Sequence, residues 1–171
     1  MKTRKYWLSL GFAAMSLGSV YASVLSHLSA IVWPMYHSQE MVFSVRKPPE
    51  WKTVRHGEFV LFLHNVPQKG SVFACIGTIP AGYYRDVFIK EQGLSELYQP
   101  GYRKYTRPIK GYPSLQLEGT YQSEPKGRLL EVLITGHGKT YQLTFFVPEA
   151  DMWNEYLPTF NNILSSFKPA R

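Results

Sequence analysis

The chain has 171 residues, a formal net charge of +7 and a single cysteine, Cys75. This length suits one domain that buries enough apolar surface to fold without a covalent staple, and one cysteine excludes an internal disulfide. Cys75 lies in the apolar run 72–76, which favours a buried, inert thiol over a reactive or intermolecular one.

The start of the chain is predicted to be an export signal. Three basic residues lie within the first five positions, and no charged residue follows before Glu40. A basic start ahead of an uncharged apolar stretch is typical of a secretory leader. We therefore divide the chain into a signal peptide or N-terminal membrane anchor, residues 1–39, and one exported domain, residues 40–171, which we expect in the periplasm.

The leader allows two outcomes after export. The apolar segment 7–17 is followed by the small-residue sequence 20–22, so cleavage after Ala22 is favoured. The alternative is an uncleaved inner-membrane anchor, because apolar character continues to Pro34. A helix of about 28 residues would be about 42 Å long, which exceeds the ~30 Å hydrocarbon core of a bilayer.

The first half of the domain is predicted to form strands and one helix. Two of the strands are apolar on both alternating faces, so a covering layer is needed on each side of the sheet, which predicts helices packed on it. Turns rich in proline and glycine separate the strands. The expected elements are strands 41–46, 58–64 and 71–79 and a helix from about Tyr84 to Leu97.

The second half predicts an antiparallel meander and a closing helix. Alternating or apolar runs separated by turns at 124–127 and 136–139 indicate strands 115–121, 129–135 and 140–147. Apolar residues at steps of three and four toward Phe167 predict an amphipathic helix, and we expect it to begin near Pro158, because proline lacks the N–H that an interior position needs. The preceding stretch 102–112 is expected to be a loop or a short edge strand.

Four segments resemble the PsbP-like and DcrB-like families. They are FSVRKPPEW at 43–51, IKGYPSLQLEGTY at 109–121, KTYQLTFFVP at 139–148 and FNNILSSFKP at 160–169. The resemblance covers about residues 41–168 and consists mostly of turn and core positions. It implies a PsbP-like α/β/α sandwich, an α+β fold with an antiparallel sheet flanked by helices. It also implies an exported accessory or binding factor rather than an enzyme, and it carries over no metal-binding or partner-binding residue.

No motif in the sequence indicates a particular catalytic chemistry. A Gly-x-Ser-x-Gly nucleophile motif and a glycine-rich phosphate loop are both missing. Glu118 and Glu131 are expected to face each other across a hairpin as an ordinary surface pair. His56, His64 and His137 are weak candidates for a metal site, because no short metal-binding spacing connects them. We therefore expect no enzymatic activity, no cofactor and no bound metal.

A basic segment rich in tyrosine is the one surface feature that suggests a partner. Positive charges and aromatic rings could bind nucleic acid, but export argues against nucleic acid as the partner. An acidic protein or an anionic membrane surface would then be the contact, and a plain solvated loop is the alternative. The candidate partner-binding residues are Arg103, Lys104, Arg107 and Lys110, together with Tyr102 and Tyr105.

These observations favour an exported, non-catalytic cell-envelope accessory protein that binds a protein partner or assists an assembly. The alternative is a periplasmic protein that binds a small molecule or a metal ion, with the three histidines as ligands. A hydrolase whose site is built from residues far apart in sequence is a third hypothesis. The sequence leaves the oligomeric state open.

Overall fold

The computed structural model describes residues 33–79, 98–121 and 126–170. The chain divides into two units, Met1–Trp33 and Pro34–Arg171, and every element below belongs to the second. Residues 1–32 of the leader, the helix expected from Tyr84 to Leu97 and part of the turn expected at 124–127 lie outside the described residues. Within the described residues, no helix combines the length and the apolar character needed to cross a membrane.

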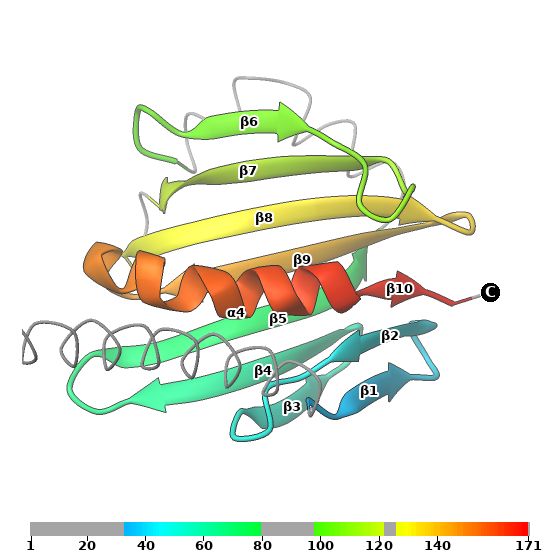
Figure 1. Cartoon of the computed structure of the whole chain (residues 1–171), viewed down its shortest axis with the longest axis horizontal. Coiled ribbons are helices and arrows are strands. Elements are labelled where there is room, and N and C mark those ends of the chain that lie inside the picture. The colour runs from blue at the N-terminus through cyan, green and yellow to red at the C-terminus, as the bar shows by residue number, and fades with distance from the viewer. Residues whose placement is uncertain (1–32, 80–97, 122–125, 171) are drawn as a thin grey trace, which may run out of the picture. The chain divides into compact units, whose positions relative to one another are not determined.

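Ten strands and one α-helix make up the described part of the fold (Figure 1). The strands before residue 80 are β1 (Met35–Ser38), β2 (Phe43–Arg46), β3 (Lys52–His56), β4 (Phe59–Val66) and β5 (Gly70–Ile79). The later elements are β6 (Arg103–Thr106), β7 (Ser114–Tyr121), β8 (Gly127–Gly136), β9 (Lys139–Val147), the 3-10 helix η1 (Ala150–Met152), α4 (Trp153–Ser166) and β10 (Lys168–Pro169).

The strands form two antiparallel sheets. The larger has seven strands in the order β3-β4-β5-β9-β8-β7-β6, and the smaller has the order β1-β2-β10. Figure 1 shows α4 and the smaller sheet on the same side of the larger one. The predicted antiparallel α+β fold is confirmed. β1 begins at Met35, so the folded unit includes residues that the expected boundary at residue 40 assigned to the leader.

We call the side of the large sheet that α4 covers the helix face. Its core is aromatic: the Phe160 ring of α4 lies 5.1 Å from Phe145 of β9, and Phe167, just after α4, lies 5.4 Å from Phe43 of β2. Phe160 and Phe145 are 0% exposed. Burial of large rings between helix and sheet is the main apolar contribution on this face.

The closing helix begins earlier than the sequence predicts. It starts at Trp153 rather than near Pro158, and Pro158 lies inside it. Proline removes the bond to the carbonyl four residues earlier, which here belongs to Asn154. Asn154 and Pro158 are both exposed, so water can satisfy that carbonyl, and the helix continues through the proline.

The other side of the large sheet, the opposite face, has its own apolar cluster. Its buried members are Tyr98, Leu115, Leu117, Leu129, Leu133 and Phe146. Gly127, at the start of β8, packs so closely that a Cβ there would lie 2.4 Å from the Val147 carbonyl oxygen. Because both faces carry a core, polar side chains buried within the sheet are positioned by rigid surroundings.

Candidate functional site

The basic segment forms one edge of the large sheet. β6 pairs only with β7 among the described strands, with Arg103 opposite Glu118 and Tyr105 opposite Gln116. This confirms the interpretation of residues 102–112 as containing a short edge strand. Because side chains alternate along a strand, Arg103 and Tyr105 lie on the helix face, and Lys104 lies on the opposite face.

A carboxylate at this edge is held by two guanidinium groups. Glu118 Oε1 accepts from Nη2 of Arg103 at 2.7 Å and from Nη2 of Arg128 at 2.6 Å. The Glu118 side chain is 9% exposed, whereas those of Arg103 and Arg128 are 65% and 32% exposed. Hydrogen bonding to Glu118 raises the pKa of Arg103. Arg103 is therefore engaged within the domain, and sequence reasoning missed the role of Glu118.

Arg128 connects this carboxylate to the closing helix. Its guanidinium lies 4.9 Å from the centre of the Trp153 ring, at the start of α4. A cation over the face of an indole ring is electrostatically favourable. The chain of contacts from Arg103 through Glu118 and Arg128 to Trp153 therefore fixes the β6 edge relative to α4.

The helix-face side chains of β7 form a buried polar row beside β6. Ser114, Gln116 and Glu118 are 7%, 0% and 8% exposed. Ser114 Oγ donates to the Arg107 carbonyl oxygen and accepts from Gln116 Nε2 at 3.4 Å. Gln116 Oε1 is buried and has no hydrogen-bond partner in the described part of the chain. This row fixes the backbone at Arg107, just after β6.

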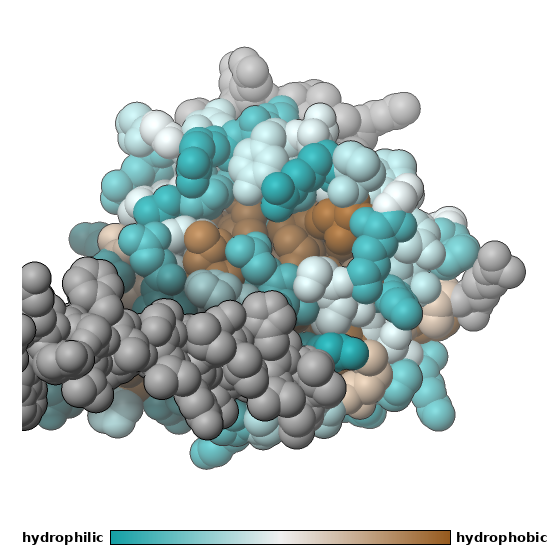
Figure 2. Space-filling model, in the orientation of Figure 1, coloured by the Kyte–Doolittle hydropathy of each residue, from teal (hydrophilic) through white to brown (hydrophobic). Residues whose placement is uncertain are grey.

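The surface beside the row is shallowly hollowed. A depression of about 420 Å³ lies among Thr106, Arg107, Pro108, Gly111, Pro113 and Ser114. Figure 2 shows apolar surface between α4 and the β6 edge, bordered by hydrophilic side chains. The edge therefore offers a charged strand next to a small concave surface.

The structure does not bring all six candidate partner-binding residues into one patch. Lys104 is exposed, and the Arg107 guanidinium lies 5.7 Å from the Tyr105 ring centre. These three residues share the edge with Arg103. Tyr102 instead packs against Tyr98, with ring centres 5.8 Å apart, in the apolar cluster of the opposite face.

Lys110 belongs to a second group of cations. It lies in the turn between β6 and β7 with φ of 50°. Burial lowers its pKa, and the nearby charges of Lys168 and Arg46 lower it further. The charges that act on Lys110 therefore come from β10 and β2 rather than from β6.

The expected pairing of Glu118 with Glu131 is wrong. Glu118 lies opposite Leu130, and Glu131 lies opposite Leu117. A shift of one residue in register turns a side chain to the other face, so the two carboxylates lie on opposite sides of the sheet. Glu131 is on the opposite face, among apolar side chains.

Glu131 is a buried carboxyl group with two neutral donors. Tyr98 Oη donates to its Oε2, and Gln142 Nε2 donates to its Oε1 at 2.8 Å. Burial raises the pKa of Glu131, and these two hydrogen bonds oppose the rise only in part. Burial also raises the pKa of Tyr98. The position of Glu131 within the apolar run 129–134 was the sequence signal for its burial.

The three candidate metal-binding histidines do not converge. His56 lies opposite Phe59, and His64 is five residues further along β4, so their Cα atoms are about 16 Å apart at about 3.3 Å per residue. His64 stacks on Trp51, whereas His137 contacts Tyr112 from the turn before β9. No group of three or more His, Cys, Asp or Glu residues suited to a metal ion occurs within the described ranges.

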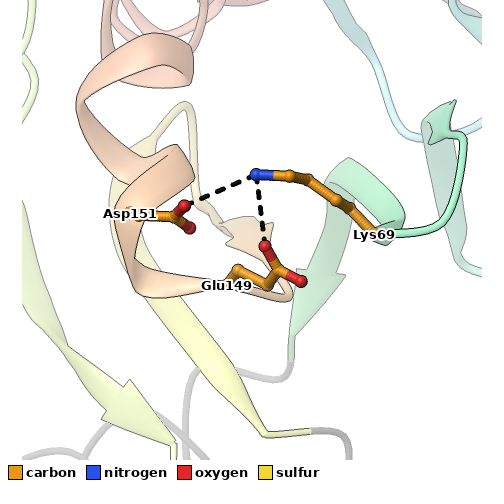
Figure 3. A network of polar contacts seen from close by, with 3 residues as sticks. All are labelled: Lys69, Glu149 and Asp151. Carbon is orange, nitrogen blue, oxygen red and sulfur yellow. Dashed lines mark hydrogen bonds and ion pairs between the residues drawn. The ribbon is translucent and has the colours of Figure 1, made fainter.

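Two further polar features are structural. Lys69 lies 3.3 Å from Glu149 and 3.4 Å from Asp151, which connects the β4–β5 turn to the start of η1 (Figure 3). All three side chains are well exposed, so this network contributes little stability. Burial raises the pKa of the Cys75 thiol to about 11, which agrees with the expectation of an unreactive cysteine.

Comparison with solved structures identifies similar folds. PA94 of Pseudomonas aeruginosa, a protein of unknown function, has 15% identity, covers 81% of this chain and 98% of its own, and gives a TM-score of 0.54. A Bacteroides thetaiotaomicron protein has 18% identity and a TM-score of 0.51; the match covers 80% of this chain and 48% of that protein. Cyanobacterial PsbP from Synechocystis has 16% identity, covers 80% of this chain and 91% of its own, and gives a TM-score of 0.49.

These similarities concern the fold alone. PA94 and the Bacteroides protein, whose TM-scores exceed 0.5, support the shared fold, and a PsbP protein is among the similar structures. No protein-family model matches the sequence, and no curated protein matches it. Function must therefore be argued from the residues of this chain.

Proposed function

We propose that this protein is an exported, non-catalytic accessory protein of the cell envelope, and that it binds an acidic segment of a protein partner along β6. The observation that carries the proposal is the cationic edge strand. Among the described strands β6 is the last of the large sheet, and Lys104 and Arg107 form no ion pair with any described residue. The uncharged stretch after a basic N-terminus supports export.

An edge strand offers two kinds of interaction to an extended segment. Every second residue directs its N–H and C=O away from the sheet, where another strand can pair with them. The cations then favour an acidic segment and disfavour a second copy of this chain, whose net charge is +7. The polar row of β7 keeps the edge in place before a partner arrives, so little conformational entropy is lost on binding.

Crosslinking from the edge strand tests the proposed contact. A photoreactive side chain at Thr106 of β6 should capture a partner in the envelope, and the same group at Val54 of β3, at the other edge, should not. Lys104→Glu with Arg107→Glu should abolish the adduct. Arg103 is left unchanged, because reversing it would place a second carboxylate beside buried Glu118.

The matched control reverses two exposed cations elsewhere, Lys52→Glu with Lys139→Glu, which changes the net charge equally. It should leave the Thr106 adduct intact, and higher salt should reduce capture by the unmodified protein. Equal capture from Val54, or capture that survives reversal of Lys104 and Arg107, would contradict the proposal.

Export has an independent test. Mass measurement of the mature N-terminus in the envelope fraction should give Ser23, because cleavage after Ala22 is favoured. An N-terminus at Met1 in the membrane would instead support the anchor. A full-length chain confined to the cytosol would refute export altogether.

A further inference from the structure

A glycine leaves a hollow in the opposite face of the large sheet. Gly77 of β5 lies between Phe59 of β4 and Gln142 of β9 in the register of the three strands. Without a side chain at Gly77, a cavity of about 280 Å³ opens, and its lining includes Phe59, Gln142, Cys75 and Ile79. A Cβ at Gly77 would lie 3.0 Å from the Glu58 carbonyl oxygen and 3.2 Å from Phe59 Cβ.

The polar wall of the cavity is held in place by the buried carboxyl group. Gln142 Nε2 donates to Glu131 at 2.8 Å, and Tyr98 donates to the other carboxyl oxygen. This bond leaves the Gln142 amide oxygen, which is an acceptor, and one remaining N–H, which is a donor. Burying a carboxyl group and an amide in a sheet face costs stability, so their presence beside a cavity suggests a use in binding.

The groups around the cavity favour a cation. Glu58 is an acidic residue of the lining, Gln142 and Thr144 contribute oxygen atoms, and none of the lining residues that the structure describes is a lysine or an arginine. This is notable in a chain whose net charge is +7. An acceptor-rich pocket selects ligands that carry N–H donors and positive charge.

The remaining wall is apolar and includes an aromatic ring. Phe59 is 38% exposed, and its ring stacks on His56 with centres 5.2 Å apart, so the ring is held in position. Ile79 adds an aliphatic surface. An aromatic face also attracts a cation. Ligand pockets usually have volumes of about 300–1,000 Å³, so this cavity suits a molecule with about one ring.

We propose that the Gly77 cavity binds a small organic amine, with the ammonium group near Glu58 and Gln142 and the apolar body against Phe59 and Ile79. This site is separate from the β6 edge and does not depend on the proposed partner. It uses none of the three histidines as a ligand.

Titration calorimetry with three probes of similar shape tests the proposal. Phenethylamine should bind the full chain at least tenfold more tightly than 2-phenylethanol, and phenylacetate should not bind. Glu58→Gln keeps the shape of the pocket and should weaken phenethylamine binding at least fivefold. Glu155→Gln, an exposed acidic residue of α4 on the helix face, is the matched control and should have no effect.

Two further measurements keep the outcome decisive. Gly77→Ala should weaken binding by narrowing the hollow, and if that variant does not fold, the Glu58→Gln result decides. Cys75 lines the cavity and is the single cysteine, so saturating phenethylamine should slow its alkylation by iodoacetamide. Equal affinity for the amine and the alcohol, unchanged binding by Glu58→Gln, or no binding at all would overturn the proposal.

Discussion

The two ion pairs of Glu118 offer a controlled test of how burial sets the strength of a charge interaction. Both arginines donate Nη2 to the same carboxylate oxygen at nearly the same distance, 2.6 Å for Arg128 and 2.7 Å for Arg103. They differ in exposure, since the Arg128 side chain is 32% exposed and that of Arg103 is 65% exposed. Solvent therefore screens the Arg103 pair more strongly.

Two double-mutant cycles that share Glu118→Gln measure the difference. A charge-assisted hydrogen bond at a partly buried site contributes about 1.5–3 kcal/mol, so we expect a coupling free energy in this range with Arg128→Met. An exposed pair contributes about 0.2–1 kcal/mol, which is our expectation with Arg103→Met. Arg128→Met removes the cation–π contact with Trp153 whether residue 118 is Glu or Gln, so this contact cancels from the coupling free energy.

Urea unfolding followed by far-UV circular dichroism gives the four free energies of each cycle. Fluorescence alone is unsuitable, because Trp153 lies beside Arg128 and its emission would change with the substitution. A coupling with Arg103 that equals or exceeds that with Arg128 would refute the argument. The anchoring of the β6 edge would then depend on something other than the partly buried contact.

Three further predictions follow from the cores and the buried carboxyl group. Burial raises the pKa of Glu131 above its ordinary value of 4.5, so its contribution to stability is full below that pH and is lost as the pH rises through the folded-state pKa. Glu131→Gln should therefore gain stability relative to the unmodified protein as the pH rises above 4.5; a pH-independent difference in urea unfolding would contradict this. Phe160→Ala should lower the unfolding free energy by about 3–5 kcal/mol, because Phe160 is 0% exposed; a loss below 1 kcal/mol in the same assay would show that the ring is not core. With its pKa raised to about 11 by burial, the Cys75 thiol should react with iodoacetamide far more slowly at pH 8 in the folded protein than in urea, and equal rates would refute its burial.

Sequence patterns predicted the large sheet well where one or both faces of a strand are buried. β7, β8 and β9 match the expected meander because alternation and turn residues both mark them. β3 was missed because all five of its residues are exposed, which leaves no alternation to detect. β1 was missed because it lies within the uncharged segment that was interpreted as leader.

Which side chains meet at the candidate site depends on the pairing register of β7 with its neighbouring strands. The sequence does not determine that register to within one residue. The register of β7 and β8 pairs Glu118 with Leu130 rather than with Glu131, and this single step sends the two carboxylates to different faces. The basic segment was recognised from its composition, but its division into an edge strand and a turn depends on pairing with β7. The Gly77 cavity arises from three strands that are adjacent only in the folded sheet.

The buried carboxyl groups on the two faces of the sheet therefore have different hydrogen-bond partners, and this difference affects what each face can bind. Glu118 is held by two guanidinium groups, so it anchors a cationic edge without leaving its own charge available to a ligand. Glu131 is held by a tyrosine and a glutamine, so no cation within the described contacts offsets it, and it lies behind an acceptor-rich cavity. Under the two proposals, the sheet binds an acidic segment at its edge and a small amine on its opposite face at the same time. Because the two sites share no residue, reversing the charge of Lys104 and Arg107 should leave amine binding unchanged.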